Sequence, residues 1–144
     1  MTIQIQAYNR SLALFLSIVA LAIGGGIYLS FRSDTLLMFR WTESLQLNVF
    51  VENLRQSMSF YAPPDFVKYS LPDGLWLFSY MFLVDAIWNG SKSISAYIFI
   101  YYLPFLALMS EFLQYLGLVP GVFDWIDVAS YLFAILLYIT IKLV

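Results

Sequence analysis

Residues 94–144 read ISAYIFIYYLPFLALMSEFLQYLGLVPGVFDWIDVASYLFAILLYITIKLV, which is two long apolar runs separated by one short turn. Each run is long enough to cross the roughly 30 Å hydrocarbon core of a bilayer as a helix. Pro104 predicts a kink inside the first of these helices, and a Pro-Gly pair marks the turn. The stretch therefore predicts a transmembrane helical hairpin whose turn is flanked by the carboxylates of Glu111, Asp124 and Asp127.

Two further apolar runs precede this hairpin. Only 11% of the residues are charged, whereas a soluble domain carries about 25%. A chain of 144 residues has too much surface to bury such a composition in its own core, so we expect lipid to cover much of it. We predict an all-α membrane protein, one integral membrane domain over residues 1–144. It is a bundle of four transmembrane helices at about residues 11–31, 72–89, 94–118 and 126–144.

Acidic residues stand at the start of the second and fourth predicted spans and near the end of the third. If the chain crosses the membrane four times, these three points lie at one membrane face. Ionisable groups inside or at the edge of the hydrocarbon are costly, so they are functional-site candidates by default. The candidate catalytic residues are Glu111, Asp127 and Asp73, and the candidate binding residues are Gln114, Asp124, Tyr131 and Trp76.

Helical spacing groups these side chains. Glu111 and Gln114 are three residues apart, and Tyr131 lies four residues beyond Asp127, so each pair shares a helix face. We expect Gln114 and Tyr131 to hydrogen-bond Glu111, and an Arg or Lys of the long connection to close the pocket. Such a cluster suits acid–base chemistry, a proton relay or a divalent cation. The alternatives are a plain helix cap for Asp124, and polar contacts that only hold helices together for Glu111 and Asp127.

The connection between the first two spans, around residues 35–66, is predicted to lie at the membrane interface. From Leu47 to Tyr61, apolar residues recur at helical spacing and polar residues take the other face. This pattern is typical of an amphipathic surface helix, and we expect it to cover the acidic site. The alternation of apolar residues from Leu45 to Val51 leaves a strand as the alternative for its first part.

The absence of histidine and cysteine excludes thiolate catalysis, Cys/His zinc sites and histidine bases. Seven Lys and Arg against nine Asp and Glu give a net charge of −2, which disfavours nucleic acid as a partner. We expect no cofactor and assign no metal. Membrane lipid is the expected partner.

The first span holds two pairs of small residues at four-residue spacing, Ala20 with Gly24 and Ala22 with Gly26. Such pairs let another helix approach closely. The partner is either a helix of the same chain or a second copy in a homo-oligomer.

The opposite membrane face holds Asp85, for which a structural ion pair with Lys92 or Lys142 is the favoured interpretation. Lys and Arg are almost equally divided between the two faces. Lys and Arg are denser in the termini and in the short turn around Lys92 than in the long connection. This favours the cytoplasm for the face that holds Asp85, so the acidic face is expected to point away from the cytoplasm.

Two motifs carry a family resemblance. Ser110–Tyr131, SEFLQYLGLVPGVFDWIDVASY, resembles the signature of VanZ-like membrane proteins, in which a Glu and a Gln late in one span precede a short turn and acids that open the last span. Lys68–Trp76, KYSLPDGLW, is similar to the start of an earlier span in a subgroup of small bacterial proteins of this type. The resemblance implies a cell-envelope protein of the bacterial inner membrane, in a family named for resistance to the glycopeptide teicoplanin.

Three classes of function fit these observations. The acidic cluster favours a pocket for a lipid headgroup or a small envelope substrate, with the reaction and even enzymatic activity left open. The glycine-rich first span and the surface helix favour a non-catalytic membrane subunit or helix-packing partner. Carboxylates within apolar spans favour a small oligomeric pore.

Overall fold

The computed structural model describes residues 9–143, and these residues form seven helices and no strand. The helices are α1 (Arg10–Phe31), α2 (Leu37–Ser44), α3 (Asn48–Met58), α4 (Asp65–Lys68), α5 (Ser70–Ile87), α6 (Ile94–Tyr115) and α7 (Trp125–Leu143). Three of them, α1, α6 and α7, are long and apolar enough to cross a membrane. Their outward faces carry large apolar side chains that are more than half exposed, such as Phe15, Phe105 and Phe133. The prediction of an all-helical membrane protein is therefore confirmed at this level.

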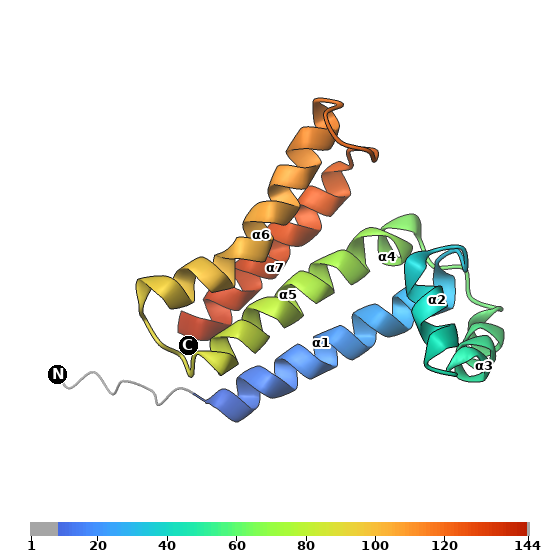
Figure 1. Cartoon of the computed structure of the whole chain (residues 1–144), viewed down its shortest axis with the longest axis horizontal. Coiled ribbons are helices and arrows are strands. Elements are labelled where there is room, and N and C mark those ends of the chain that lie inside the picture. The colour runs from blue at the N-terminus through green and yellow to red at the C-terminus, as the bar shows by residue number, and fades with distance from the viewer. Residues whose placement is uncertain (1–8, 144) are drawn as a thin grey trace.

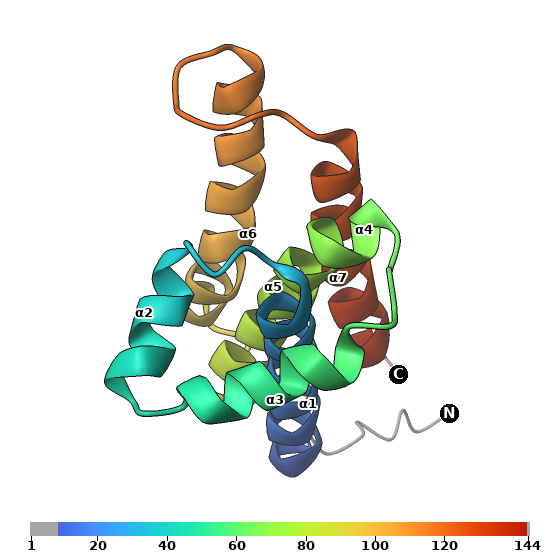
Figure 2. The ribbon, with the colours of Figure 1, turned by 90° about the vertical axis from the view of Figure 1, so that its right-hand side faces the viewer.

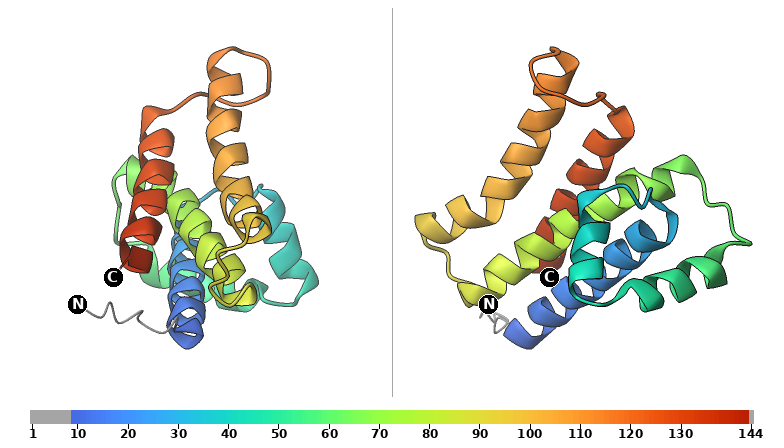
Figure 3. Two further views of the ribbon diagram at one scale, coloured as in Figure 1. Left: turned by 90° about the vertical axis from the view of Figure 1, so that its left-hand side faces the viewer. Right: turned by 45° about the vertical axis from the view of Figure 1, so that its right-hand side comes forward.

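Helix α5 lies in the middle of the structure and packs against α1, α6 and α7 (Figure 1). It runs beside α1 in the opposite direction, while α6 and α7 form a hairpin that leans away from this pair. The start of α1, the turn between α5 and α6, and the end of α7 lie at one end of the structure (Figure 3). We call it the terminal end, and we call the end at which α5 and α7 begin the acidic end.

The core sits where the four long helices converge, toward the terminal end. Its buried side chains come from all four of them: Ala13, Met81, Phe82, Ala86, Ile100 and Tyr138. The rings of Phe82 and Tyr138 join α5 to α7 with their centroids 5.0 Å apart. Helix α6 changes direction along its length (Figure 1) and contains Pro104, which removes a backbone donor from its middle. Beyond this point α6 and α7 extend past the core, so the acidic end is the more open one.

Close contact between α1 and α5 uses one of the two small-residue pairs. Ala20 is 4% exposed, and a Cβ built on Gly24 would lie 2.9 Å from the Trp76 ring and 3.2 Å from the Leu75 Cβ. Only glycine lets the Trp76 ring lie this close to α1. The intramolecular interpretation of this pair is therefore correct. A Cβ on Gly26 would meet nothing within 4 Å, and a contact of Ala22 and Gly26 with a second copy stays a prediction.

The connection from α1 to α5 folds as three short helices rather than as one surface helix. Gln46 adopts a φ of 58° in the turn before α3, and the strand alternative for this region is wrong. Helix α3 packs against α1 and α2 (Figure 2). The guanidinium of Arg55 donates to the carbonyl oxygens of Leu29, at 3.1 Å, and Arg32, at 2.9 Å. Carbonyls at a helix C-terminus lack partners within the helix and attract cations, so α3 is held at the end of α1. The expectation that this helix covers the acidic site is wrong.

Replacing Gly24 with alanine is predicted to lower the free energy of unfolding by about 1–3 kcal/mol, because the new methyl group overpacks the α1–α5 contact. Thermal or denaturant unfolding in detergent measures the change. Gly25→Ala is the matched control, since a Cβ there meets nothing within 4 Å and alanine favours a helix by roughly 0.5–1 kcal/mol. Equal destabilisation by both variants would contradict the contact.

Candidate functional site

Asp73 and Asp127 occupy the first turns of α5 and α7. A carboxylate in a first turn is stabilised by the unpaired N–H groups of the helix and by its dipole. The two helices touch just beyond these acids, where a Cβ on Gly74 would lie 3.1 Å from both the Cβ and the carbonyl oxygen of Ser130. This contact places two helix N-termini side by side. The negative charge of Asp127 consequently acts on Asp73.

Glu111 belongs to the last turns of α6 and is 5% exposed. One of its oxygens, Oε2, accepts a hydrogen bond of 3.3 Å from the backbone N–H of Asp124. The side chain of Asp124 in turn accepts from the N–H of Ile126 at 2.8 Å, so it caps α7 as the plainer interpretation expects. Glu111 therefore fastens the end of α6 to the start of α7.

The partners expected for Glu111 are wrong: among the described residues neither Gln114 nor Tyr131 hydrogen-bonds to it. The Nε2 of Gln114 donates to the Ser110 hydroxyl at 3.5 Å, and the Gln114 side chain lies against Gly121. The Tyr131 hydroxyl, by contrast, lies within electrostatic range of Asp73, Asp127 and Glu111. Spacing alone predicted a hydrogen bond between Gln114 and Glu111. The backbone N–H of Asp124, at the end of the α6–α7 turn, donates to Glu111 instead.

Arg32, which directly follows α1, is a cation near Asp73. Its charge acts on Asp73, and its guanidinium lies over the rings of Tyr28, at 5.3 Å, and Tyr69, at 4.9 Å. No ion pair joins Arg32 to an acid among the described residues, so the expectation that a cation of the long connection closes the pocket stays a prediction, with Arg32 as the candidate. Its sequence signal is its position as the first charge after the first long apolar run.

Two buried polar atoms at this end have no hydrogen-bond partner among residues 9–143: Nε1 of Trp76 and Oδ1 of Asp127. Leaving a buried donor or acceptor unpaired costs roughly 1–3 kcal/mol, so such atoms mark places where a polar ligand or water is favoured. The Trp76 ring packs on Tyr28 at 5.1 Å between centroids. Trp76 and Asp73 are three residues apart on α5 and share a side of that helix.

An apolar groove of about 370 Å³ runs between α6 and α7 beside this cluster. Its walls are Leu108, Phe112, Tyr115, Phe123, Trp125 and Val128, and Glu111 lies at its inner side. The Phe123 ring stands edge-on between Tyr115 and Trp125, at 5.3 and 4.8 Å. The groove is therefore apolar with one carboxylate, Glu111, among its lining residues, an arrangement suited to an amphiphile.

A divalent-cation site finds no support in the described part of the chain. No three Asp or Glu residues there lie close enough together to hold a metal ion. The acidic residues are near enough to influence one another, yet too dispersed for a common ligand sphere. The arrangement is suited to hydrogen bonds and charge contacts with a larger polar group.

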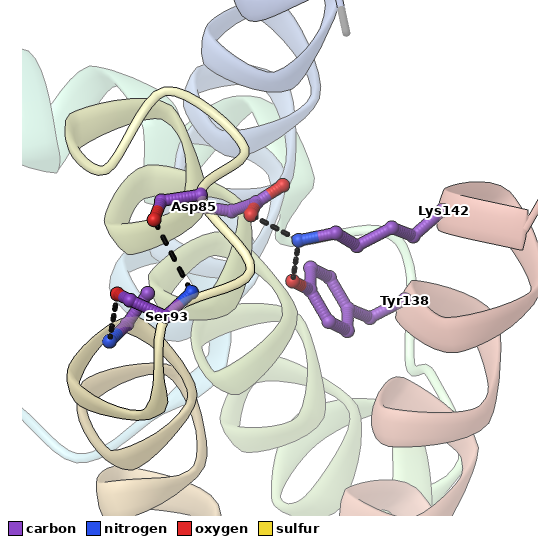
Figure 4. Close-up of polar contacts among 6 residues, drawn as sticks. Asp85, Ser93, Tyr138 and Lys142 are labelled. Atoms are coloured by element: carbon purple, nitrogen blue, oxygen red, sulfur yellow. Dashed lines mark hydrogen bonds and ion pairs between the residues drawn. The ribbon is translucent and has the colours of Figure 1, made fainter. Parts of the chain in front are cut away.

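Asp85 is placed at the terminal end, away from the acidic site. It is 1% exposed and forms an ion pair with Lys142, whose ammonium also donates to the Tyr138 hydroxyl at 3.1 Å (Figure 4). The sequence-based prediction of a structural ion pair is confirmed, with Lys142 as the partner. The pair joins the end of α5 to the last turn of α7.

Comparison with known proteins adds no assignment: the chain matches no family model, no curated protein and no solved structure.

Replacing Glu111 with leucine is predicted to cost about 1–3 kcal/mol of stability relative to Glu111→Gln. Leucine leaves the part-buried N–H of Asp124 without an acceptor, whereas the glutamine oxygen retains one. Thermal unfolding of the two variants measures the difference, and both remove the same charge. Equal stability of the two would show that the bond to Asp124 contributes nothing.

Proposed function

We propose that the protein is a four-span membrane protein of the bacterial inner membrane whose acidic end binds the headgroup of an amphiphile. The observation that carries the proposal is the combination of an apolar groove lined by Glu111 with an unpaired buried oxygen of Asp127 near the same end of the helices. Neither component alone indicates a lipid-like ligand. Together they match a molecule with an apolar tail and a polar head.

The fourth span in this proposal is α5. Its 18 residues are about 27 Å long as a helix, close to the thickness of the hydrocarbon core. It lies antiparallel to α1 (Figure 1), which is itself long and apolar enough to span. Because α5 is surrounded by α1, α6 and α7, it needs less apolar surface than a lipid-facing helix. Its acids Asp73 and Asp85 stand near its two ends.

The chemistry of the site favours a zwitterionic head that carries an ammonium group. Oδ1 of Asp127 requires a donor, and Asp73 adds a second negative charge beside it. Arg32 supplies a positive charge near Asp73. An ammonium suits the two carboxylates, and a phosphate suits the guanidinium. Phosphatidylethanolamine carries both groups, and its chains are suited to the groove between α6 and α7.

The VanZ-like resemblance remains part of this proposal. The residues of the two motifs, from α5 and from the α6–α7 hairpin, gather at the acidic end. Glu111, Asp124 and Asp127 surround the hairpin turn, and Asp73 lies beside Asp127. A shared cluster of this kind is what a common signature would preserve.

Cysteine labelling tests the four-span topology, because the chain has no native cysteine. We expect Ser33→Cys and Val122→Cys to react with an impermeant reagent from one side, and Ser91→Cys from the other. Labelling after membrane permeabilisation is the control for each position. Reaction of Ser33→Cys and Ser91→Cys from the same side would exclude a crossing by α5.

Binding of the headgroup is tested by thermal unfolding of the purified protein with added lipid. Phosphatidylethanolamine is expected to raise the unfolding temperature more than phosphatidylcholine, whose quaternary ammonium has no hydrogen to donate to Asp127. Asp127→Asn is expected to weaken apparent binding by about tenfold or more, since a hydrogen bond to a charged group contributes roughly 1.5–3 kcal/mol.

Asp34→Asn is the matched control, because Asp34 is an exposed acid in the connection that follows α1. It removes the same charge near the same end and is expected to leave lipid protection unchanged. Equal protection by the two lipids, or an equal loss in both variants, would refute this site.

A further inference from the structure

A second pocket lies at the terminal end, between the first half of α6 and the last turns of α7. It has a volume of about 280 Å³ and is lined by Lys92, Tyr97, Tyr101, Tyr138, Ile139 and Lys142. It is separate from the acidic site, because it is built from the other ends of the same two helices. Helix α6 contains Pro104 and changes direction along its length (Figure 3).

Lys142 is held in place within this pocket. Its ammonium is fixed by Asp85, which is buried, and by the hydroxyl of Tyr138 (Figure 4). An ammonium has three hydrogens to donate, and these two bonds use two of them. The lysine is thus positioned at the pocket wall with a donor remaining, and its side chain is 22% exposed.

The pocket carries an excess of positive charge. Two lysines line it, and of these Lys142 is paired with the carboxylate of Asp85. Lys92 precedes α6, whose first turn is capped by Ser93 through a bond of 3.2 Å from the Ala96 N–H. The start of a helix is positive, so a lysine there is not favoured by the helix itself. An anion in the pocket would compensate the charge of Lys92 and the positive end of the α6 dipole.

Tyrosine hydroxyls add neutral donors. Within residues 9–143, Tyr97 and Tyr101 form no side-chain hydrogen bond, although Tyr101 is half-buried. The Tyr101 ring stands edge-on to Tyr138, with the centroids 6.4 Å apart. Lysines and tyrosines together supply charged and neutral donors around one space, which is the chemistry that recognises a phosphate group.

We propose that this pocket binds the phosphate of an anionic membrane lipid. The location of the pocket favours the phosphate of a lipid over a soluble phosphate. The pocket is formed at the ends of two helices that are able to span a membrane. The first turns of α6, which also carry Tyr97, hold exposed apolar side chains, with Ile94 79% and Ile98 59% exposed, so acyl chains have a surface to follow. Basic pockets between membrane helices are known binding places for such headgroups.

The inference does not rest on the proposed function, because it concerns another lipid and another end of the bundle. It is tested by titrating phosphatidylglycerol into the purified protein and following thermal unfolding, with phosphatidylcholine as the neutral lipid. Glycerol phosphate provides the soluble arm. Phosphatidylglycerol is expected to protect the protein, and glycerol phosphate is not.

Lys92→Gln is expected to weaken apparent binding of phosphatidylglycerol about fivefold, the effect of one lysine at a membrane surface. Lys92 is exposed and outside the ion pair, so the variant is expected to fold. Arg10→Gln is the matched control, since Arg10 is an exposed cation at the same end but outside the pocket. Tyr101→Phe, which removes a hydroxyl without a charge, is expected to weaken binding as well.

Loss of lipid protection in Lys92→Gln and Tyr101→Phe, with retention in Arg10→Gln, supports the pocket. An equal loss in Arg10→Gln would reduce the effect to general surface charge and overturn the proposal. Equal protection by glycerol phosphate would overturn the lipid as its ligand.

Discussion

The burial of α5 between three other helices is the constraint on which the rest of the structure depends. Glycine makes this possible at two places. Gly24 admits the Trp76 ring on the α1 side, and Gly74 admits the backbone of α7 at Ser130. Because α5 carries Asp73 near one end and Asp85 near the other, placing it centrally also places one carboxylate at each end of the bundle. The position of a single helix therefore organises both polar regions.

The two ends use that arrangement differently. At the terminal end, where the helices converge, Asp85 is neutralised by Lys142 and the pair stabilises the packing of α5 against α7. At the acidic end, α6 and α7 extend beyond the core, and the carboxylates are held by backbone donors and helix N-termini. The carboxylate of Asp85 is therefore compensated by a direct ion pair, whereas the carboxylates of the candidate site have no such pair among the described residues. A partly compensated acidic cluster next to an apolar groove is suited to a ligand.

The long connection illustrates how tertiary contacts override a correct local pattern. The periodicity from Leu47 onward identified a helix, and Asn48–Met58 is helical. Periodicity says which side of a helix is apolar but not which neighbour it meets. That choice was made by Arg55, whose guanidinium binds carbonyl oxygens at the end of α1. A bond between residues more than twenty positions apart has no local signature.

The sequence by itself determined the all-helical class, three helices long and apolar enough to cross a membrane, and the proline inside α6, because these follow from apolar length and from one residue. It also determined which acids lie near helix ends, and it predicted the Asp85 ion pair from the lysines expected at the same membrane face. Tertiary structure alone decided that Glu111 binds the Asp124 backbone instead of Gln114, that Arg32 lies near Asp73, and that Trp76 faces a glycine of α1. The physical reason is that a sequence pattern reports only on neighbours within one element. Hydrophobic periodicity acts within one helix, whereas a pocket is formed by side chains from several helices whose contact depends on how closely their backbones approach.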